Sequence, residues 1–520
     1  MKQLQIDLTP EEYHEAGLRR RAVARAAGMA EGDLGEVREV RRTLDCRRKP
    51  LYHTTFELCA VGEQLPPDEV QGWMDRYRHV GAEAPRVAIV GAGPAGLFAA
   101  LRCLELGLRP LVLERGKPVE ERRRDVATLA REKRVDPESN WCFGEGGAGT
   151  YSDGKLYTRS TKRGDVGAVL RTFVAHGADP AITLDAHAHI GTDRLSGIVA
   201  QMRHTVLEHG GEYHFGTRMT GLKVGDGRVR GVLTADGAVV DADAVVLATG
   251  HSARDIYTLF ARQGWLLEAK PFAVGVRVEH PQQLINEIQY HGSGYSKHLP
   301  PAAYSLTTQA AGHGVFSFCM CPGGVIVPAA TADGQQVVNG MSNSHRNSPF
   351  ANSGIAVTVG LDDVGGDDPL ALLRFQQQIE ADAFAAGGNT INAPTQRLVD
   401  FLRGRQSSRL RKSSYLGDTV AAPLHELLPP FVATSMAEAF RHFDRKMRGF
   451  ITDEALLLAV ESRTSSPVRI PRDRETLQHP QLAGLYPCGE GAGYAGGIVS
   501  SALDGIRCVD AIFSCLPQRP

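Results

Sequence analysis

The chain contains a glycine-rich turn between an apolar strand and a helix, and residues of these types at this spacing bind phosphate. Gly91, Gly93 and Gly96 form the pattern G-x-G-x-x-G directly after the apolar run 87–90. Gly91 permits the tight turn, Gly93 lets a pyrophosphate approach the backbone, and Gly96 lets the helix pack on the strand. The N–H groups and dipole at the start of the helix favour an anion.

Glu114 ends the next apolar strand and is placed to accept hydrogen bonds from a ribose. This fingerprint serves NAD and FAD alike, so it predicts a dinucleotide without choosing between them. The residues of this unit that we expect to bind the dinucleotide are Gly91, Gly93, Pro94, Ala95, Gly96, Glu114 and Arg115.

A second glycine-rich segment, FGEGGAGTYSDGKL at residues 143–156, has no strand pattern in front of it. Glycines here would let the main chain pass against a ligand without Cβ clashes. The alternative is an ordinary exposed turn. The residues of this loop that we expect at a cofactor are Gly147, Ala148, Gly149, Thr150, Asp153 and Lys155.

The composition is that of a globular protein with more than one domain. A chain of 520 residues exceeds one ordinary core, and its net charge of -1 gives no field that would recruit nucleic acid or anionic membrane. No apolar run is long enough to span a membrane, and the acidic start lacks a signal-peptide pattern, so we expect a cytoplasmic location.

The nine cysteines are scattered, which suits a reducing compartment better than a disulfide framework. Cys319 and Cys321 in FCMCPGG are a close pair. The favoured interpretation is a pair of buried apolar thiols, while a metal or redox pair stays open. We find no credible set of metal ligands among the scattered histidines.

Three further segments favour FAD over NAD. These are VVLATGHSARD (245–255), YPCGEGAGYAGGIVSSALDGI (486–506) and HFGTRMTGL (214–222). Together with the turn at Gly91 they resemble the FAD-dependent oxidoreductases with the glutathione-reductase-type FAD fold. The chain is most similar to a poorly characterised family of FAD-dependent dehydrogenases, and more distantly to geranylgeranyl reductases and aromatic hydroxylases. Other segments that carry the resemblance are FAVGVRVEHPQ, FCMCPGG, NGMSNSHRNSPFANSG and ESRTSSPVRI.

The resemblance implies an α/β fold built around a discontinuous Rossmann-like FAD-binding domain. We expect that domain at residues 83–265 and 466–520, with an inserted α+β substrate domain at 266–465 and a small N-terminal α+β domain at 1–82. In the N-terminal unit, Thr9 and Glu12 are placed as a capping box and two strands follow.

The resemblance also assigns cofactor contacts outside the first turn. Glu490 fills a slot that is commonly Asp in related flavoproteins, and the helix after Gly497 would aim its N-terminus at the O2 edge of the flavin. Lys155 would favour an anionic flavin, because it would lie beside the ring. The residues implied by the resemblance are Met219, Thr249, Gly250, Gly489, Glu490, Gly497 and Ile498.

No second dinucleotide fingerprint occurs between residues 260 and 465, and no C-x-x-x-x-C is present, so a disulfide reductase of the glutathione-reductase type is not expected. NAD(P)H would then visit the flavin transiently as the electron donor. The catalytic candidates are Lys155, His345 and Arg254, although His345 and Arg254 have a surface or capping role as the alternative.

We therefore predict a dehydrogenase or reductase that transfers hydride between flavin N5 and a small organic substrate. A flavin monooxygenase is the alternative within the same class. An RNA-associated flavoprotein is the alternative outside it, but an N-terminal unit whose basic and acidic residues balance does not favour nucleic-acid binding. The sequence gives neither the substrate nor the oligomeric state.

Overall fold

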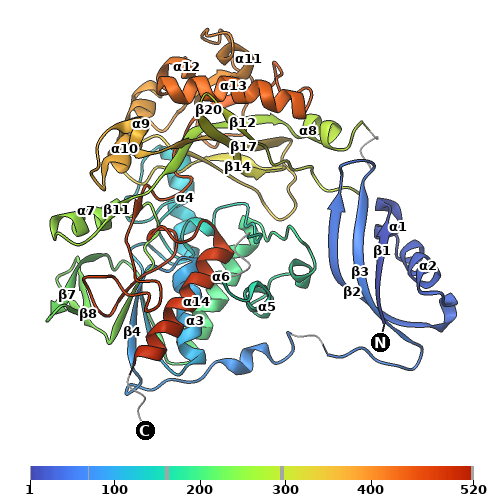
Figure 1. Cartoon of the computed structure of the whole chain (residues 1–520), viewed down its shortest axis with the longest axis horizontal. Coiled ribbons are helices and arrows are strands. Elements are labelled where there is room, and N and C mark those ends of the chain that lie inside the picture. Colours follow the sequence, from blue (N-terminus) through green and yellow to red (C-terminus); the bar gives the residue numbers. More distant parts are fainter. Residues whose placement is uncertain (1, 68–69, 159–162, 293–297, 517–520) are drawn as a thin grey trace.

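The computed structural model describes residues 2–67, 70–158, 163–292 and 298–516. Figure 1 shows three parts: a small N-terminal domain at one side, a domain with a parallel sheet, and an inserted domain above it. The predicted α/β fold class is confirmed, because strands from both ends of the chain share one sheet.

The parallel sheet has the strand order β22-β10-β4-β5-β6. Its strands are β4 (Arg86–Val90), β5 (Arg109–Leu113), β6 (Glu212–His214), β10 (Ala244–Leu247) and β22 (Leu485–Pro487). β10 and the part of β4 after Arg86 consist of apolar residues only, because helices and a second sheet bury both faces of these strands. The C-terminal strand β22 completes the sheet beside β10, so the domain is discontinuous as predicted.

One face of this sheet packs on helices and the other packs on a meander of strands. Figure 1 shows α14 and α3 side by side, although they lie at opposite ends of the chain. The elements of the helical layer are α3 (Pro94–Glu105), α5 (Val166–Ala175), α6 (Thr192–Glu208) and α14 (Ile498–Cys515). The elements of the other layer are β7 (Met219–Gly225), β8 (Arg228–Thr234), β9 (Val239–Asp241) and α7 (Arg254–Arg262).

The inserted domain is built on a seven-stranded sheet of order β13-β14-β17-β12-β20-β18-β19. These strands are β12 (Phe272–Pro281), β13 (Thr307–Ala310), β14 (His313–Cys321), β17 (Phe350–Val359), β18 (Ala393–Arg397), β19 (Thr419–Ala421) and β20 (Leu456–Glu461). The chain enters and leaves at one place, where β11 (Glu268–Ala269) pairs with β21 (Val468–Arg469). The residues between β11 and β21 form the inserted domain.

Helices cover one face of the inserted sheet, and α13 contributes several of the apolar side chains in the core between them. Their bounds are α8 (Gln282–Gln289), α9 (Leu361–Val364), α10 (Ala371–Ala386), α11 (Leu398–Phe401), α12 (Leu424–Leu427) and α13 (Pro430–Lys446). A ribbon of β15 (Val325–Pro328) and β16 (Val338–Met341) packs on the same sheet. α4 (Val119–Glu132) connects the parallel sheet to the second glycine-rich loop.

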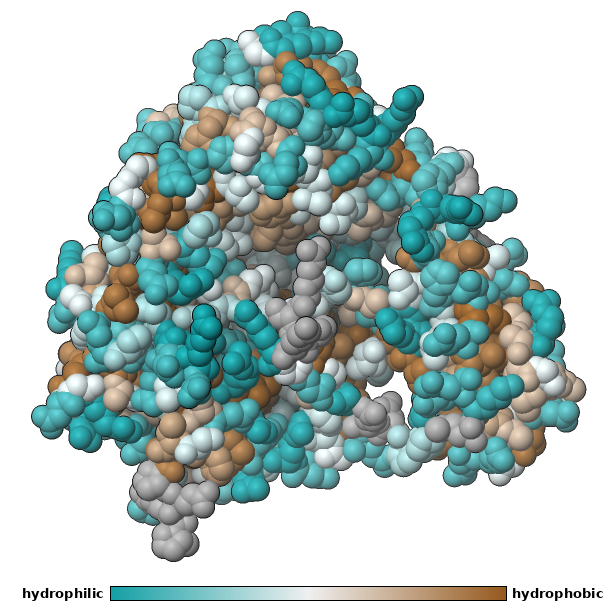
Figure 2. Space-filling view, viewed as in Figure 1, coloured by the Kyte–Doolittle hydropathy of each residue, from teal (hydrophilic) through white to brown (hydrophobic). Residues whose placement is uncertain are grey.

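The N-terminal domain has a three-stranded sheet of order β1-β3-β2 and two helices. Its elements are β1 (Lys2–Leu8), α1 (Pro10–His14), α2 (Ala16–Ala27), β2 (Leu34–Asp45) and β3 (Leu51–Ala60). The predicted capping box is confirmed, since Thr9 Oγ1 accepts from Glu12 N at 3.2 Å and Glu12 Oε2 accepts from Thr9 N at 3.0 Å. In the space-filling view this domain forms one side of the molecule (Figure 2), and Arg42 N donates across to the Leu184 carbonyl oxygen at 2.8 Å.

Two details of the domain boundaries differ from the expectation. β1 is a strand that the sequence pattern did not predict, and it pairs with β3 along its whole length. Tyr77 and Val80 fall in the expected N-terminal unit, yet they pack in the core of the parallel-sheet domain. No helix of the described ranges combines the length and the apolar character needed to cross a membrane.

Candidate functional site

A cavity of about 370 Å³ lies where the carboxyl ends of the parallel strands face the inserted domain. This is the edge at which open α/β sheets bind their ligands. Most of the sequence-predicted cofactor residues line it: Gly91, Gly93, Pro94, Ala95, Glu114, Arg115, Gly147, Ala148, Gly149, Asp153, Lys155, Met219, Thr249, Gly250, Gly489, Glu490, Gly497 and Ile498.

The first turn brings the start of α3 to this cavity. Gly93 is the N-cap of α3, Pro94 is its first residue, and no side chain of the described residues caps this end. The first N–H groups of the helix are therefore available to a ligand. Gly96 does not line the cavity: a Cβ there would collide with the carbonyl oxygen of Gly91, so Gly96 keeps the helix close to the turn.

Glu114 has backbone partners that the sequence did not predict. Its buried carboxylate accepts hydrogen bonds from the backbone N–H groups of Ala92 at 2.9 Å, Gly116 at 2.9 Å and Gly144 at 3.0 Å. These bonds join the first glycine turn to the second glycine-rich loop. A carboxylate has about four lone-pair sites, so one acceptor position remains for a ribose hydroxyl.

The second glycine-rich loop is held in place by Arg122 of α4, which is fully buried. Its guanidinium donates to the carbonyl oxygens of Asn140 at 2.9 Å, Trp141 at 2.9 Å, Glu145 at 2.7 Å and Gly147 at 2.8 Å. Burial lowers the pKa of Arg122, but an arginine stays charged at any physiological pH. The loop therefore forms a rigid wall of the cavity rather than an exposed turn.

Asp153 and Lys155 at the end of this loop connect it to the inserted domain. The buried Asp153 carboxylate accepts a hydrogen bond from Arg346 at 2.7 Å and another from the Ser342 hydroxyl. Lys155 Nζ donates to the carbonyl oxygen of Met320 and lies 3.7 Å from Asp153 Oδ2. Burial lowers the pKa of Lys155, but Cys319, Cys321 and Asp153 raise it by more, so its ammonium stays protonated.

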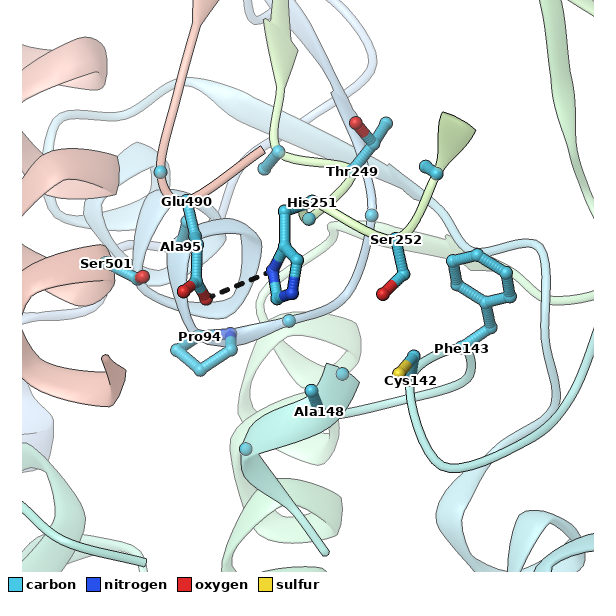
Figure 3. A pocket seen from close by; sticks show the side chains of 18 of the residues that line it. Pro94, Ala95, Cys142, Phe143, Ala148, Thr249, His251, Ser252, Glu490 and Ser501 are labelled. Carbon is cyan, nitrogen blue, oxygen red and sulfur yellow. Dashed lines mark ion pairs between the residues drawn. The ribbon is translucent and has the colours of Figure 1, made fainter. Parts of the chain in front are cut away.

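The opposite wall is formed by the ends of β10 and β22. His251, just after Thr249 and Gly250, places Nδ1 3.6 Å from Glu490 Oε2. Figure 3 shows these two side chains facing each other beside Pro94 and Ala148. α14 begins at Ile498 after Gly497, and no side chain of the described residues caps it. Its N-terminal groups face the cavity that α3 also faces.

The structure does not bring four of the predicted residues into the cavity lining: Gly96, Thr150, Arg254 and His345. Thr150 is buried, and its hydroxyl donates to the Glu145 carbonyl oxygen at 3.3 Å. Arg254 turns away toward α10, where it pairs with the buried Glu380 at 2.7 Å. His345 is exposed and lines a separate cavity beside Gln282 and Asn286.

Several cavity residues were not assigned by the sequence: Cys142, Phe143, Tyr157, Arg218, Ser252, Asp255, Phe318, Cys319, Asn339, Arg463 and Ser501. Phe318, Cys319, Asn339 and Arg463 come from the inserted domain. Their segments FCMCPGG, NGMSNSHR and ESRTSSP carried the family resemblance, which was the signal that could have found them.

The cavity fits the predicted FAD in three respects. The starts of α3 and α14 offer N–H groups without side-chain caps, as an elongated anionic ligand requires. The turns at Gly93 and Gly147 come so close that a Cβ on Gly147 would lie 3.1 Å from Gly93 Cα, which leaves bare backbone as the wall. His251 Nε2 is buried without a hydrogen-bond partner among the described residues.

One group of possible metal ligands occurs in the described residues, formed by Cys488, Asp504 and Cys508. The Asp504 carboxylate is already bound by Arg472, with NH2 at 2.6 Å from Oδ1 and NH1 at 3.0 Å from Oδ2. It also accepts from Gly489 N at 2.8 Å. The Arg472 guanidinium already neutralises the Asp504 carboxylate, so we interpret Asp504 as half of a structural ion pair and not as a metal ligand.

Comparison with protein families gives two matches. Residues 271–464 match the family described as FAD-dependent protein, C-terminal domain-like, and residues 195–346 match the family described as FAD dependent oxidoreductase. An uncharacterized protein of Clostridium beijerinckii is 38% identical over 509 residues, which cover 94% of each chain.

Two solved structures of flavin enzymes are distantly similar to this chain. A geranylgeranyl bacteriochlorophyll reductase-like protein of Thermoplasma acidophilum is 12% identical, with a TM-score of 0.34 over 83% of this chain and 79% of the other. A flavin-dependent brominase is 15% identical, with a TM-score of 0.32 over 82% and 78% of the two chains. The assignment therefore rests on the family matches and on the relative of full length.

Proposed function

Because the chain belongs to the family of FAD-dependent oxidoreductases, together with the Clostridium beijerinckii protein, we propose that it acts as a dehydrogenase or reductase on a small organic substrate. The observation that carries this proposal is that two sources of positive potential face one cavity. They are the start of α14 at Ile498 and the ammonium group of Lys155.

FAD, when bound, supplies the N5 position that accepts or donates a hydride. The start of α3 at Gly93 would hold its pyrophosphate, and Glu114 and Arg115 lie where the adenosine end would be bound. The start of α14 and Lys155 would stabilise the negative charge of the reduced cofactor, because a fixed dipole and a nearby cation favour developing anions. This arrangement favours hydride uptake from a substrate.

The substrate would enter from the side of the inserted domain. Phe318 and Asn339 bring an apolar ring and an amide to the cavity, and Arg463 brings a guanidinium. Arg463 is anchored by Glu380, with Nε 3.1 Å from Oε1, and by the Thr331 hydroxyl at 2.9 Å. These groups would orient a small polar molecule, and a transient NAD(P)H would use the same entrance.

The purified full-length protein tests the proposal. It should carry visible flavin absorbance or regain it with added FAD, and NADH, NADPH or a candidate substrate should bleach that absorbance without oxygen. A protein that neither retains nor rebinds FAD would contradict the proposal at its base.

A monooxygenase is distinguished by the fate of oxygen. The reduced protein should pass its electrons to an acceptor without placing an oxygen atom in the substrate. Incorporation of labelled oxygen into a product would favour the monooxygenase. Binding to RNA finds no support in the N-terminal domain, where Arg38 pairs with Glu57 at 2.8 Å and Arg42 with Asp185 at 3.3 Å.

A further inference from the structure

β14 ends in an irregular turn of backbone that carries two cysteines. Its pairing with β17 shifts register between Phe318 and Cys321, and Cys319 adopts a left-handed φ of 44°. Such bulges occur beside functional sites, where they redirect a side chain. A non-glycine residue in this conformation costs free energy, so other contacts must hold it in place.

Arg277 of β12 supplies those contacts. Its fully buried guanidinium donates to the carbonyl oxygen of Cys319, to Glu461 Oε2 at 2.7 Å and to Asn339 Oδ1 at 3.1 Å. Gly340 leaves room for the guanidinium, since a Cβ there would clash with it. A charged network is therefore built around a strained bulge at the wall of the FAD cavity.

The bulge brings the two thiols together. Cys321 is fully buried, and its Sγ donates toward the Cys319 carbonyl oxygen at 3.2 Å. Cys319 lines the cavity. The hydrogen bond from Cys321 lowers the pKa of Cys319, and the nearby cations Lys155 and Arg277 lower it further. A thiolate is the reactive form of cysteine.

A second cysteine pair at the same cavity allows the environment of Cys319 to be compared with that of another thiol. Cys488 and Cys508 also lie close together, and Cys488 lines the same cavity. The hydrogen bond with Cys508 and burial raise the pKa of Cys488 well above its ordinary value. Asp504 raises the pKa of Cys488 and Arg472 lowers it, whereas Lys155 and Arg277 lower the pKa of Cys319 and Asp153 raises it. Of the two cavity-lining cysteines, Cys319 therefore has a lowered pKa and Cys488 a raised one.

We propose that Cys319 and Cys321 form a redox-active dithiol–disulfide pair that exchanges electrons with FAD. Starting from one thiolate and one thiol, the S–S bond forms and the remaining S–H bond breaks. The pair gives up two electrons and one proton, which FAD takes up as a hydride equivalent to become the reduced anion. In the reverse direction, reduced FAD opens the disulfide, which makes the pair a relay to an external dithiol or disulfide.

The first test follows the thiols directly and needs no bound flavin. The full-length protein is equilibrated without oxygen in mixtures of reduced and oxidised dithiothreitol, quenched in acid and alkylated. The tryptic peptide that ends at Arg346 contains Cys319 and Cys321 and none of the other cysteines. We expect this peptide to lose two hydrogens reversibly as the mixture becomes more oxidising, while Cys488 and Cys508 stay alkylated.

The rate of alkylation adds a kinetic signature. At neutral pH we expect Cys319 to react about tenfold faster than Cys488, because only Cys319 has a lowered pKa. If both thiols of the β14 pair were alkylated fully and slowly in every mixture, the proposal would be overturned.

The second test counts electrons in the protein with FAD bound. Anaerobic titration should take about four electrons per FAD in the wild type, two for FAD and two for the disulfide. The variants Cys319→Ser and Cys321→Ser should take about two, while Cys508→Ser should match the wild type. A wild type that takes only two electrons, or a serine variant that takes four, would refute the relay.

The inference rests on the proposed function only in that FAD is the electron partner. The two can fail separately. If the disulfide forms reversibly but the protein oxidises no small organic substrate, the redox pair is supported and the dehydrogenase proposal is contradicted. If the protein oxidises a substrate while both thiols stay reduced, the dehydrogenase proposal is supported and the redox pair is contradicted.

Discussion

At the scale of single residues, the charge of Lys155 is the feature that most directly sets the reactivity proposed for this site. It is the loop cation that faces the cavity, and its hydrogen bond to Met320 holds it in place. Asp153, its neighbour, is committed to Arg346 and Ser342, so it leaves the ammonium only partly neutralised. A cation in this position stabilises an anionic reduced flavin more than an oxidised one.

Replacing Lys155 with Met should therefore lower the reduction potential of the bound flavin. We expect a shift of about 30 mV or more, which corresponds to about 1.4 kcal/mol for a two-electron couple. Lys155→Arg keeps the charge and should stay near the wild-type value. A potentiometric titration followed by flavin absorbance measures both, and equal potentials for wild type and Lys155→Met would contradict this role.

At the scale of elements, the second glycine-rich loop owes its shape to a helix that precedes it. Arg122 projects from α4 and collects the carbonyl oxygens of the loop, while Glu114 at the end of β5 collects backbone N–H groups from the loop and from the first turn. One buried cation and one buried carboxylate thus fix two glycine-rich segments against each other. Backbone groups buried without such partners would cost free energy.

Substitution of Arg122 by Met should destabilise the protein by about 3 kcal/mol and release FAD, because it leaves several buried carbonyl groups without donors. The free energy of unfolding from chemical denaturation and the flavin content after gel filtration measure the two effects. Arg124→Met in the exposed part of the same helix is the matched control and should change neither. If Arg122→Met retained FAD and full stability, the loop would keep its conformation without Arg122.

At the scale of the whole molecule, the parallel-sheet domain and the inserted domain are joined by a buried ionic cluster. Glu380 of α10 binds Arg254 of α7 at 2.7 Å and Arg463 at 3.1 Å. Burial raises the pKa of Glu380, but Arg463 and Arg254 lower it by more, to about 2. Arg254 thus serves to join the domains in this structure, while Arg463 reaches from the same cluster into the cavity.

This cluster predicts a pH dependence of stability. The pKa of Glu380 is depressed from 4.5 in the unfolded chain to about 2, so its stabilising effect is complete above pH 4.5 and is lost as the pH falls toward 2. The effect at neutral pH is about 3 kcal/mol. Glu380→Gln should lose about this much at neutral pH, and its unfolding curve should approach that of the wild type in acid.

The control for this prediction is Asp382→Asn, an exposed residue of the same helix. It should follow the wild type at every pH. If Glu380→Gln were less stable by the same amount at all pH values, the loss would come from packing rather than from the carboxylate charge.

The sequence by itself determined the features that depend on neighbours along the chain. The strand, glycine turn and helix at residues 86–105 follow from local spacing, as do the Thr9 capping box and the apolar strands. Segments that carry the family resemblance predicted the discontinuous domain, and most of the residues predicted to bind FAD line one cavity.

Only the tertiary structure decided which distant side chains meet. His345 lies on an exposed segment beside another cavity, Arg254 faces Glu380, and Glu114 binds backbone, because each of these outcomes depends on contacts far apart in sequence. The contacts of Arg122 with the second glycine-rich loop and the position of Cys319 at the cavity also depend on residues far apart in sequence. A buried charge must find its partners wherever the fold brings them, and no local pattern records that choice.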